Sequence, residues 1–399
     1  MLDKSLVFKL FEAFSIERWN DLVRPFHPME MDKVAEKMFL AFIIGKYEEK
    51  KGVHIDWTHV ITHSVFALLE KIALSDIKAP IQYIIRTTYA EEYKGVKEWI
   101  FSQYEGLIDN ADFALRFSSY LFEERQSKIE DDILFASHQI ASLRELEILA
   151  PSNEAFRIEG IMREIKNDVL DFVHLDGVKS FLQKGDTYKL ITEIEKLRFQ
   201  VRWNKSPRIP STSVLGHSYF VSLLILLMCY DLGLDENRLY TNFFSGLFHD
   251  LPEAVTRDII SPVKSATDAL PEVVKKIEEE FVERELLPLI DESYKPEVLY
   301  YIRNEFENRV MVDGEVVIVE DYEELGTKYS DVKYRACDGK LVRFADQISA
   351  FMEAESSIRH GITSEQLEDG RRRILEKYPS TKVINGFAVD KFFAPFRAN

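Results

Sequence analysis

The chain has 399 residues, of which 46% are hydrophobic, and it carries a formal net charge of −17. This length and apolar content exceed what one typical core needs, so two domains are expected. The acidic balance argues against stable binding to nucleic-acid phosphates or anionic membranes, whose protein partners carry basic surfaces. A small anionic substrate stays compatible, because a metal ion and a few local cations can reverse the field inside one pocket.

The N-terminal segment, residues 1–19, mixes charged and apolar residues at helical spacing and lacks the pattern of a signal peptide, so it predicts a first helix. The most apolar run, residues 219–230, is shorter than the roughly 20 residues that cross a bilayer, and it predicts a helix buried on all sides. Two cysteines, Cys229 and Cys337, are too few for a disulfide framework. They favour a reducing cytoplasm.

Most of the chain carries apolar residues at intervals of three and four, as in residues 191–199 and 273–287, which is the periodicity of helices. The exception is residues 309–319, where valines flank Asp313-Gly314, a dipeptide suited to a tight hairpin turn. The sequence therefore predicts an all-α protein with one small β-hairpin inserted between two late helices.

Short motifs recur in the same order in the two halves of the chain, which indicates a diverged duplication. The matching pairs are Arg18-Trp19-Asn20 with Arg202-Trp203-Asn204, residues 75–80 with residues 257–262, and residues 138–141 with residues 346–349. The boundary between the halves is expected within residues 151–185, a segment that itself has a helical pattern.

The residues that suggest chemistry begin with His249-Asp250, which interrupts an otherwise apolar helix. On a continuous helix, Glu253 lies four residues from His249 and three from Asp250, so the three side chains project towards one side. A buried imidazole with two carboxylates is costly unless a cation or mutual pairing compensates it. Alternatively, the apolar segment simply ends here, with Asp250 and Glu253 in solvent.

Two further interruptions strengthen the first interpretation. His217 opens the apolar helix that follows Ser211-Thr212-Ser213, a run of good helix-start residues. Asp346 places a carboxylate on what should be a buried helix face. His217 alone would more often be a structural histidine, and Asp258 and Lys264 bring an acid and a base close to the His-Asp pair.

In this order, His217, His249-Asp250 and Asp346 resemble the metal signature of the HD-domain phosphohydrolases. The similarity covers roughly residues 186–378. Within the superfamily, the chain most specifically resembles the bacterial 5′-deoxynucleotidase branch. The motifs that carry the narrower resemblance are Arg202-Trp203, His217-Ser218, His249-Asp250-Leu-Pro-Glu253, Thr256-Arg-Asp258, Ser261-Pro262-Val263-Lys264 and Ala345-Asp346.

The resemblance implies a tandem of HD-type helical bundles with the hairpin in the C-terminal one. Residues 1–150 would form a degenerate HD-like domain without a metal site, residues 151–185 a helical linker, and residues 186–399 the active domain. One divalent transition ion, Mn, Co, Fe or Zn, would be bound by four ligands, and its mixed nitrogen and oxygen shell suits that class. The ligands are His217, His249, Asp250 and Asp346.

The resemblance also implies roles for residues that do not bind the ion. Glu253 would position or deprotonate the attacking water, or assist the leaving group, and Asp258 would act beside it by reading the sugar. Arg202 would bind phosphate and Trp203 the sugar or base, with Lys264 a further substrate contact. As alternatives, Arg202 forms a surface ion pair and Trp203 is a core aromatic.

Two features depart from the 5′-deoxynucleotidase pattern. Arg257 stands where that branch usually has glycine, and the hairpin around Asp313-Gly314 lengthens the interval before Asp346. Either feature could reshape the pocket, so the substrate is less firmly predicted than the metal site.

The repeat predicts that the N-terminal half has lost the site. It pairs Lys37 with His217, Ala67 with His249, Leu68 with Asp250, His138 with Asp346, and Lys71 with Glu253. Alanine and leucine have no donor atoms, and a protonated lysine cannot bind a metal. An alternative alignment matches residues 62–66 to residues 216–220, but no His-Asp pair follows at a suitable distance.

The expected activity is removal of phosphate from a nucleoside 5′-monophosphate, including the deoxy form. A nucleoside triphosphate or cyclic-nucleotide phosphohydrolase is the alternative among enzymes, and a nucleotide-sensing or scaffold protein with a structural metal is the alternative outside them. We expect the two halves to pack as an internal pseudo-dimer, and homo-oligomer formation stays open.

Overall fold

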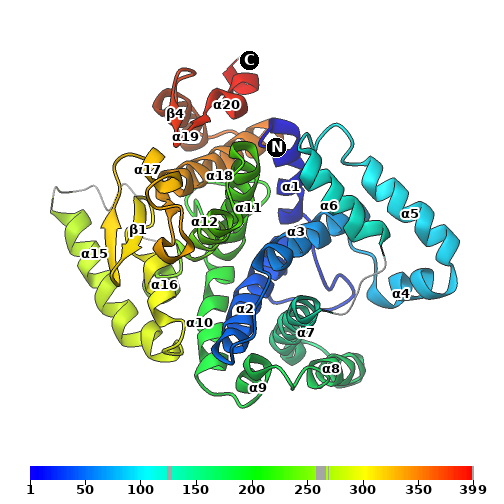
Figure 1. The fold of residues 1–399 in the computed structure, drawn as a ribbon. Coiled ribbons are helices and arrows are strands. Elements are labelled where there is room, and N and C mark those ends of the chain that lie inside the picture. The colour runs from blue at the N-terminus through cyan, green and yellow to red at the C-terminus, as the bar shows by residue number, and fades with distance from the viewer. Residues whose placement is uncertain (124–127, 258–266, 268, 398–399) are drawn as a thin grey trace.

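The computed structural model describes residues 1–123, 128–257, 267 and 269–397. These residues are mostly helical, as the periodicity predicts (Figure 1). In the first half the helices are α1 (Lys4–Phe11), α2 (Glu30–Lys50), α3 (Trp57–Leu74), α4 (Ala79–Thr88), α5 (Ala90–Ser102), α6 (Ala111–Phe122), α7 (Ile129–Leu149), α8 (Ala155–Leu170) and α9 (Asp176–Leu182).

In the second half the helices are α10 (Asp186–Phe199), α11 (Val214–Leu232), α12 (Glu236–Phe248), α13 (Glu253–Thr256), α15 (Leu270–Phe281), α16 (Lys295–Ile302), α17 (Glu323–Gly326), α18 (Gly339–Arg359), α19 (Glu365–Lys377) and α20 (Asp390–Arg397). The predicted linker, residues 151–185, is largely helical, because it contains α8 and α9.

Two long helices, α2 and α11, lie side by side at the centre of the molecule (Figure 1). Apolar residues surround α11 on all sides of its axis, so it must be covered all round, as predicted. Among the described residues it is the one helix long and apolar enough to cross a membrane, but 89% of that stretch is buried inside the protein.

The contact between α2 and α11 joins the two halves of the chain. At Gly216 a side chain would lie 2.6 Å from Asp32 and 2.7 Å from Phe14, so only glycine allows this close approach. Ser213 donates a hydrogen bond to Asp32, and Arg198 pairs with Glu36. The buried apolar residues of both halves form one continuous core.

The predicted hairpin is present between α16 and α18. Strands β1 (Asn308–Val312) and β2 (Glu315–Ile318) pair in antiparallel register, and both turn residues have positive φ, 51° at Asp313 and 85° at Gly314. Strand β3 (Cys337–Asp338) pairs with the other edge of β1 and leads directly into α18. A second small sheet pairs β4 (Val383–Ile384) with β5 (Phe387–Ala388).

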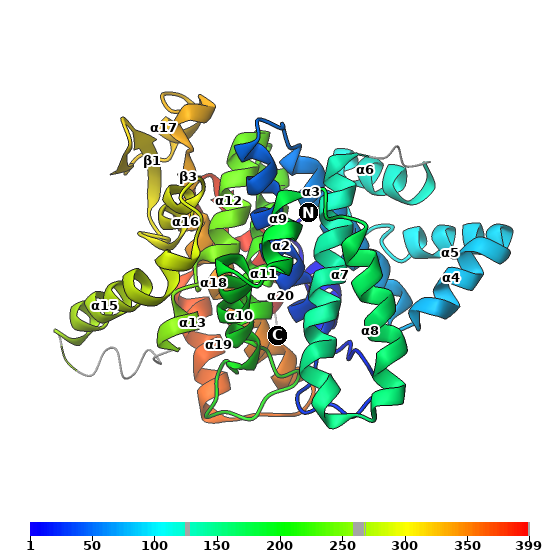
Figure 2. The same cartoon turned by 90° about the horizontal axis from the view of Figure 1, so that it is seen from below.

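The remaining elements lie around this centre. Figure 2 shows the hairpin and α15 on one side of the central helices and α4 and α5 on the opposite side. The first and last helices pack against each other, with the rings of Phe8 and Phe396 at 6.3 Å. The central helices α11, α12 and α18 are thereby held from several directions, and they carry the candidate site.

Candidate metal centre

Four side chains that are far apart in the sequence meet between α11, α12 and α18. His217 Nε2 lies 3.5 Å from Asp250 Oδ2 and 3.3 Å from Asp346 Oδ1, and His249 Nε2 lies 3.2 Å from Asp250 Oδ2. Both imidazoles are buried, whereas the two carboxylates are 18% and 20% exposed. The structure thus brings together all four residues that the sequence predicts as ligands.

His217 lies in the first turn of α11, where the helix start fixes its direction. Ser213 is the N-cap of this helix and accepts a hydrogen bond from the backbone N–H of Gly216 at 2.9 Å. On the far side of the ring, His217 Nδ1 lies 2.8 Å from the hydroxyl of Ser349 in α18. This contact orients the ring so that Nε2 points at the two aspartates.

His249 is the C-cap of α12, and its tautomer follows from its backbone partner. Nδ1 lies 2.7 Å from the carbonyl oxygen of Gly246. A carbonyl only accepts hydrogen bonds, so Nδ1 carries the proton and Nε2 has the lone pair when the ring is neutral. The nitrogen with the lone pair is the one beside Asp250.

The continuous helix expected through Glu253 is wrong. α12 ends at Phe248, and a turn follows in which Glu253 N–H donates to Asp250 O at 3.0 Å before α13 begins. The physical reason is Pro252, which has no N–H for the carbonyl of Phe248 and whose ring would clash with it. Glu253 therefore stands at the start of a new helix and not on a continuation of α12.

The position of α18, and with it Asp346, is set by the buried carboxylate of Asp338. Arg238 of α12 binds both oxygens of Asp338, at 2.6 and 2.7 Å. Asn242 and Asn385 donate to the same carboxylate at 2.8 and 2.9 Å. Asp338 is the N-cap of α18. This network therefore holds the start of α18 against α12.

The histidines offer buried donor atoms that the protein itself does not satisfy. Among the described residues, Nε2 of His217 and Nε2 of His249 have no hydrogen-bond partner of good geometry. Such orphaned buried groups are rare and call for a ligand. One nitrogen from each histidine and one oxygen of Asp346 lie within 4.8 Å of one another, and Asp250 borders them. Two nitrogens and two carboxylates suit a divalent transition ion.

The charges at this centre are strongly coupled. Burial lowers the pKa of His217, and the nearby Arg202 lowers it further. Burial also opposes the charged forms of His249 and Asp250, but their mutual attraction is stronger, which raises the pKa of His249 to about 9 and lowers that of Asp250 to about 2. The carboxylates are therefore ionised, as ligands must be.

Arg202 borders the centre and is held from behind. Its Nε donates to Glu353 at 3.1 Å, while its two terminal nitrogens lie 3.8 Å from Asp250 and 3.9 Å from Asp346. Burial opposes its charge, yet Glu353 and the two aspartates raise its pKa well above the ordinary value. A permanent positive charge therefore faces the metal ligands.

The contacts of Trp203 are those of a residue that holds the fold together. Its indole N–H donates to Glu353 at 2.7 Å, and its ring packs so closely on α19 that a side chain at Gly370 would lie 2.6 Å from it. Glu353, the shared partner of Arg202 and Trp203, was not predicted from the sequence. Its signal is a carboxylate on a buried face of α18, two helical turns after Asp346.

Two predicted site residues, Asp258 and Lys264, lie outside the described residues. Arg257, just before them, has φ 63° and ψ 159°, a region that residues other than glycine rarely adopt. The position where the 5′-deoxynucleotidase pattern has glycine thus keeps a backbone conformation that suits glycine.

The N-terminal half places a different group at the position of His217. Each long helix follows a bridge, Glu17 with Met29 before α2 and Val201 with Ser213 before α11. Counting from these bridges, Lys33 stands in α2 where His217 stands in α11, one helical turn before the Lys37 that the sequence comparison pairs with His217. The physical reason is that the backbone bridge, rather than side-chain similarity, sets where each helix starts.

The hydrogen bonds of Lys33 are those expected of a residue that stands in the place of His217. Its Nζ donates to the carbonyl oxygen of His138 at 2.9 Å and to the hydroxyl of Ser142, both on α7. His217 also contacts a serine hydroxyl, that of Ser349 in α18. Unlike Nε2 of His217, the side-chain nitrogen of Lys33 has hydrogen-bond partners within the protein.

Comparison with known families identifies part of the chain. Residues 194–375, from within α10 to within α19, match the family model of the HD domain. This segment is similar to the HD domain over that range. The HD domain indicates a metal-dependent hydrolase that acts on phosphate esters, and the buried His and Asp cluster lies inside it. No curated protein matches the chain.

Proposed function

We propose that the HD domain removes the 5′-phosphate of nucleoside monophosphates, with deoxynucleotides among the substrates. The observation that carries the phosphohydrolase part is the pair of orphaned Nε2 atoms beside two ionised aspartates, with Arg202 at their edge. The resemblance of residues 186–378 to 5′-deoxynucleotidases supports the choice of substrate.

The ion would be held by His217, His249, Asp250 and Asp346. When bound, it supplies Lewis-acid chemistry that activates water and draws electron density from phosphorus. The contact of His249 with Gly246 selects the tautomer of the neutral ring, since Nδ1 keeps its proton, so Nε2 is the nitrogen that would bind the ion once its own proton is displaced. Asp250 and Asp346 supply the negative charge that favours a divalent cation over a proton.

Arg202 would bind the phosphate. Glu353 fixes its Nε, so the edge that carries its two terminal nitrogens faces the metal ligands and can donate to phosphate oxygens. We assign no substrate contact to Trp203, because Glu353 and α19 already account for its position. Glu253 would transfer the proton, since it lies near enough to Arg202 to raise that residue's pKa.

A substrate panel tests the proposal. The chain is stripped with a chelator, reloaded separately with Mn²⁺, Co²⁺, Fe²⁺ or Zn²⁺, and assayed with 5′- and 3′-monophosphates, triphosphates and cyclic nucleotides. We expect phosphate release from 5′-monophosphates only, restored by one of these ions. Preferred hydrolysis of triphosphates or cyclic nucleotides would move the assignment to that class, and no turnover with any ion would favour a sensing or scaffold protein.

A single variant tests the role of Glu253. Glu253→Gln keeps size and hydrogen bonding but removes basicity, so turnover should fall by roughly 10²- to 10⁴-fold while metal content is unchanged. Loss of the ion with near-normal turnover would instead make Glu253 a ligand.

We further propose that residues 1–150 are a second HD-type bundle that has lost this metal centre and serves as a packing partner. The shared bridges before α2 and α11 and the recurring Arg-Trp pair support a duplication. The two halves, superposed as separate bundles, should align α2 with α11 and α7 with α18. An unrelated order of helices in that superposition would contradict the duplication.

A further inference from the structure

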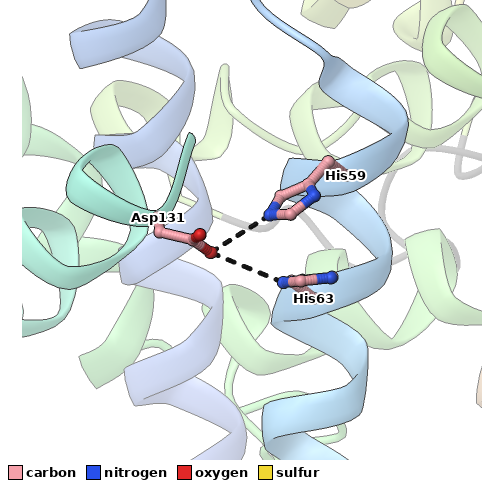
Figure 3. Close-up of side chains that lie close together, drawn as sticks. All are labelled: His59, His63 and Asp131. Carbon is pink, nitrogen blue, oxygen red and sulfur yellow. Dashed lines mark hydrogen bonds and ion pairs between the residues drawn. The ribbon is translucent and has the colours of Figure 1, made fainter. Parts of the chain in front are cut away.

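A second group of metal-competent side chains lies in the N-terminal half, outside the HD domain. His59 and His63 of α3 and Asp131 of α7 point towards one another (Figure 3). His59 Nε2 lies 3.1 Å and His63 Nδ1 3.5 Å from the same oxygen, Oδ1 of Asp131. No residue of this group belongs to the centre on α11, α12 and α18.

The sequence and the helix ends together place these residues. His59 and His63 are four residues apart, so their imidazoles share one face of α3, with ring centroids 3.6 Å apart. Asp56 caps α3 by accepting from the backbone N–H of His59, and its own N–H donates to Glu130 at the start of α7 at 2.8 Å. The first turns of both helices are therefore tied together where Asp131 stands.

The distances between these side chains also fit three ligands around one ion. A tetrahedral ion with bonds of about 2.0–2.1 Å to nitrogen and oxygen separates its ligand atoms by about 3.3 Å. The observed 3.1 and 3.5 Å lie on either side of that value. By contrast, 3.5 Å between His63 Nδ1 and the carboxylate is longer than the usual N–H···O range.

Access and orientation also suit an ion. The side chains of His59, His63 and Asp131 are 11%, 19% and 22% exposed, so an ion could enter from solvent and keep water as a further ligand. The ring of His63 packs edge-on against Tyr120 at 5.2 Å, which limits its rotation. The group is thus half-buried and oriented before any ion binds.

We propose that His59, His63 and Asp131 bind one divalent transition ion of the Zn²⁺ class, which joins α3 to α7. Two imidazole nitrogens among three donors favour such an ion over Mg²⁺ or Ca²⁺, which prefer oxygen ligands. Three protein ligands leave at least one position for water or an anion. The N-terminal half then has its own metal site, in a different place from the lost one.

The test separates the two sites by using a chain in which the HD centre is removed. The full-length His249→Ala/Asp250→Ala variant is stripped with a chelator and titrated with Co²⁺, which visible absorption detects, and with Zn²⁺, which elemental analysis counts. We expect one equivalent of ion on this variant and none after adding either His63→Asn or Asp131→Asn. The added variant His174→Asn is the control, because His174 also lies beside a carboxylate, 3.7 Å from Asp132.

A stability measurement guards against misfolding of the added variants. Zn²⁺ at about 100 times its dissociation constant should raise the melting temperature of the His249→Ala/Asp250→Ala chain by a few degrees and leave that of the His63→Asn derivative unchanged. Circular dichroism confirms that both are helical. The proposal is overturned if the double variant binds no ion, or if its ion survives both His63→Asn and Asp131→Asn.

Discussion

In the N-terminal half, Arg18 and Trp19 donate to Glu145 at 3.0 and 2.8 Å, and in the C-terminal half Arg202 and Trp203 donate to Glu353 at 3.1 and 2.7 Å. Both tryptophans have positive φ, 55° and 54°. The same contact thus occurs twice, and the copy in the C-terminal half borders the candidate metal ligands. It holds the chain before a long helix against the helix that carries the glutamate.

The two halves differ in whether the protein supplies hydrogen-bond partners for the buried nitrogen atoms near this contact. Lys33 finds its partners on α7, whereas His217 and His249 turn unsatisfied nitrogens towards two carboxylates. The comparison teaches that the Arg-Trp-Glu contact belongs to the fold, and that chemistry depends on leaving donor atoms unsatisfied. Four pairs of variants, from the largest expected effect to the smallest, test this comparison.

The largest effect should come from removing ligands. His249→Ala/Asp250→Ala should lose one equivalent of ion and lower turnover by at least about 10³-fold, since a catalytic ion contributes several kcal/mol. The matched variant Lys33→His should gain neither an ion at that position nor activity, because Ala67 and Leu68 offer no donors. Elemental analysis and a phosphate-release assay decide both. Full metal content in the double variant would contradict the ligand assignment.

The next largest effect should come from the shared glutamates. Glu145 is buried between Arg18 and Arg198, at 3.0 and 3.4 Å, so Glu145→Gln should lower the free energy of unfolding by about 3–5 kcal/mol with turnover retained. Glu353→Gln should lower both stability and turnover, the latter by about 10- to 100-fold, because Arg202 loses its anchor. Equal turnover losses in Glu145→Gln and Glu353→Gln would contradict the expected difference between the two halves.

The stability difference between wild type and Glu145→Gln should depend on pH. Burial alone would raise the pKa of Glu145, but the two arginines lower it from 4.5 to about 2. A depressed folded-state pKa stabilises the protein above the unfolded value and loses that contribution as the pH falls. The difference between the two proteins in denaturant unfolding should therefore be full above pH 4.5 and shrink towards pH 2.

A smaller effect is expected from the residue that orients His217. Ser349→Ala removes the 2.8 Å contact to Nδ1 and should weaken metal binding by about 10- to 100-fold, the usual effect of a partner behind a ligand. Ser142→Ala removes the contact of Lys33 and should leave metal binding at the HD centre unchanged. Isothermal titration with Zn²⁺ measures both. Similar affinities for the two variants would assign Ser349 no role in orienting the ligand.

The smallest expected effect is a gain in stability. Arg257 occupies a backbone region that costs a residue with a side chain about 1–3 kcal/mol, so Arg257→Gly should raise the free energy of unfolding by about 1 kcal/mol. Arg303→Gly is the control, because Arg303 has φ −105° and gains nothing from glycine. Thermal unfolding of both variants tests this prediction. A loss of stability in Arg257→Gly would show that the Arg257 side chain stabilises the fold by more than its backbone conformation costs.

The sequence singled out the four side chains that the fold brings together, because they interrupt apolar helices, and such interruptions are visible without a structure. It also predicted the hairpin, since Asp313-Gly314 has the residues that the turn requires. The helix break after His249 was missed because periodicity outweighed Pro252 in the prediction. Proline was the available signal.

Other parts of the site depend on contacts between distant segments, which no local pattern encodes. Glu353 and Ser349 matter only because α18 packs beside the start of α11. The spacing of His59 and His63 was visible, but Asp131 comes from another helix, so the trio appears only in the folded chain. The sequence comparison paired Lys37 with His217, whereas counting from the bridges before α2 and α11 gives Lys33, and these bridges are tertiary contacts.

The burial of α2 against α11 has a consequence for how the protein is made. The partner of α2 leaves the ribosome roughly 180 residues later, which at 5–20 residues per second takes roughly 10–40 s. During that time the apolar surface around Phe14 and Met31 has no α11 to cover it. Nascent chains should therefore depend on chaperones until α11 is complete, and cells that make residues 1–150 alone should accumulate them as aggregates.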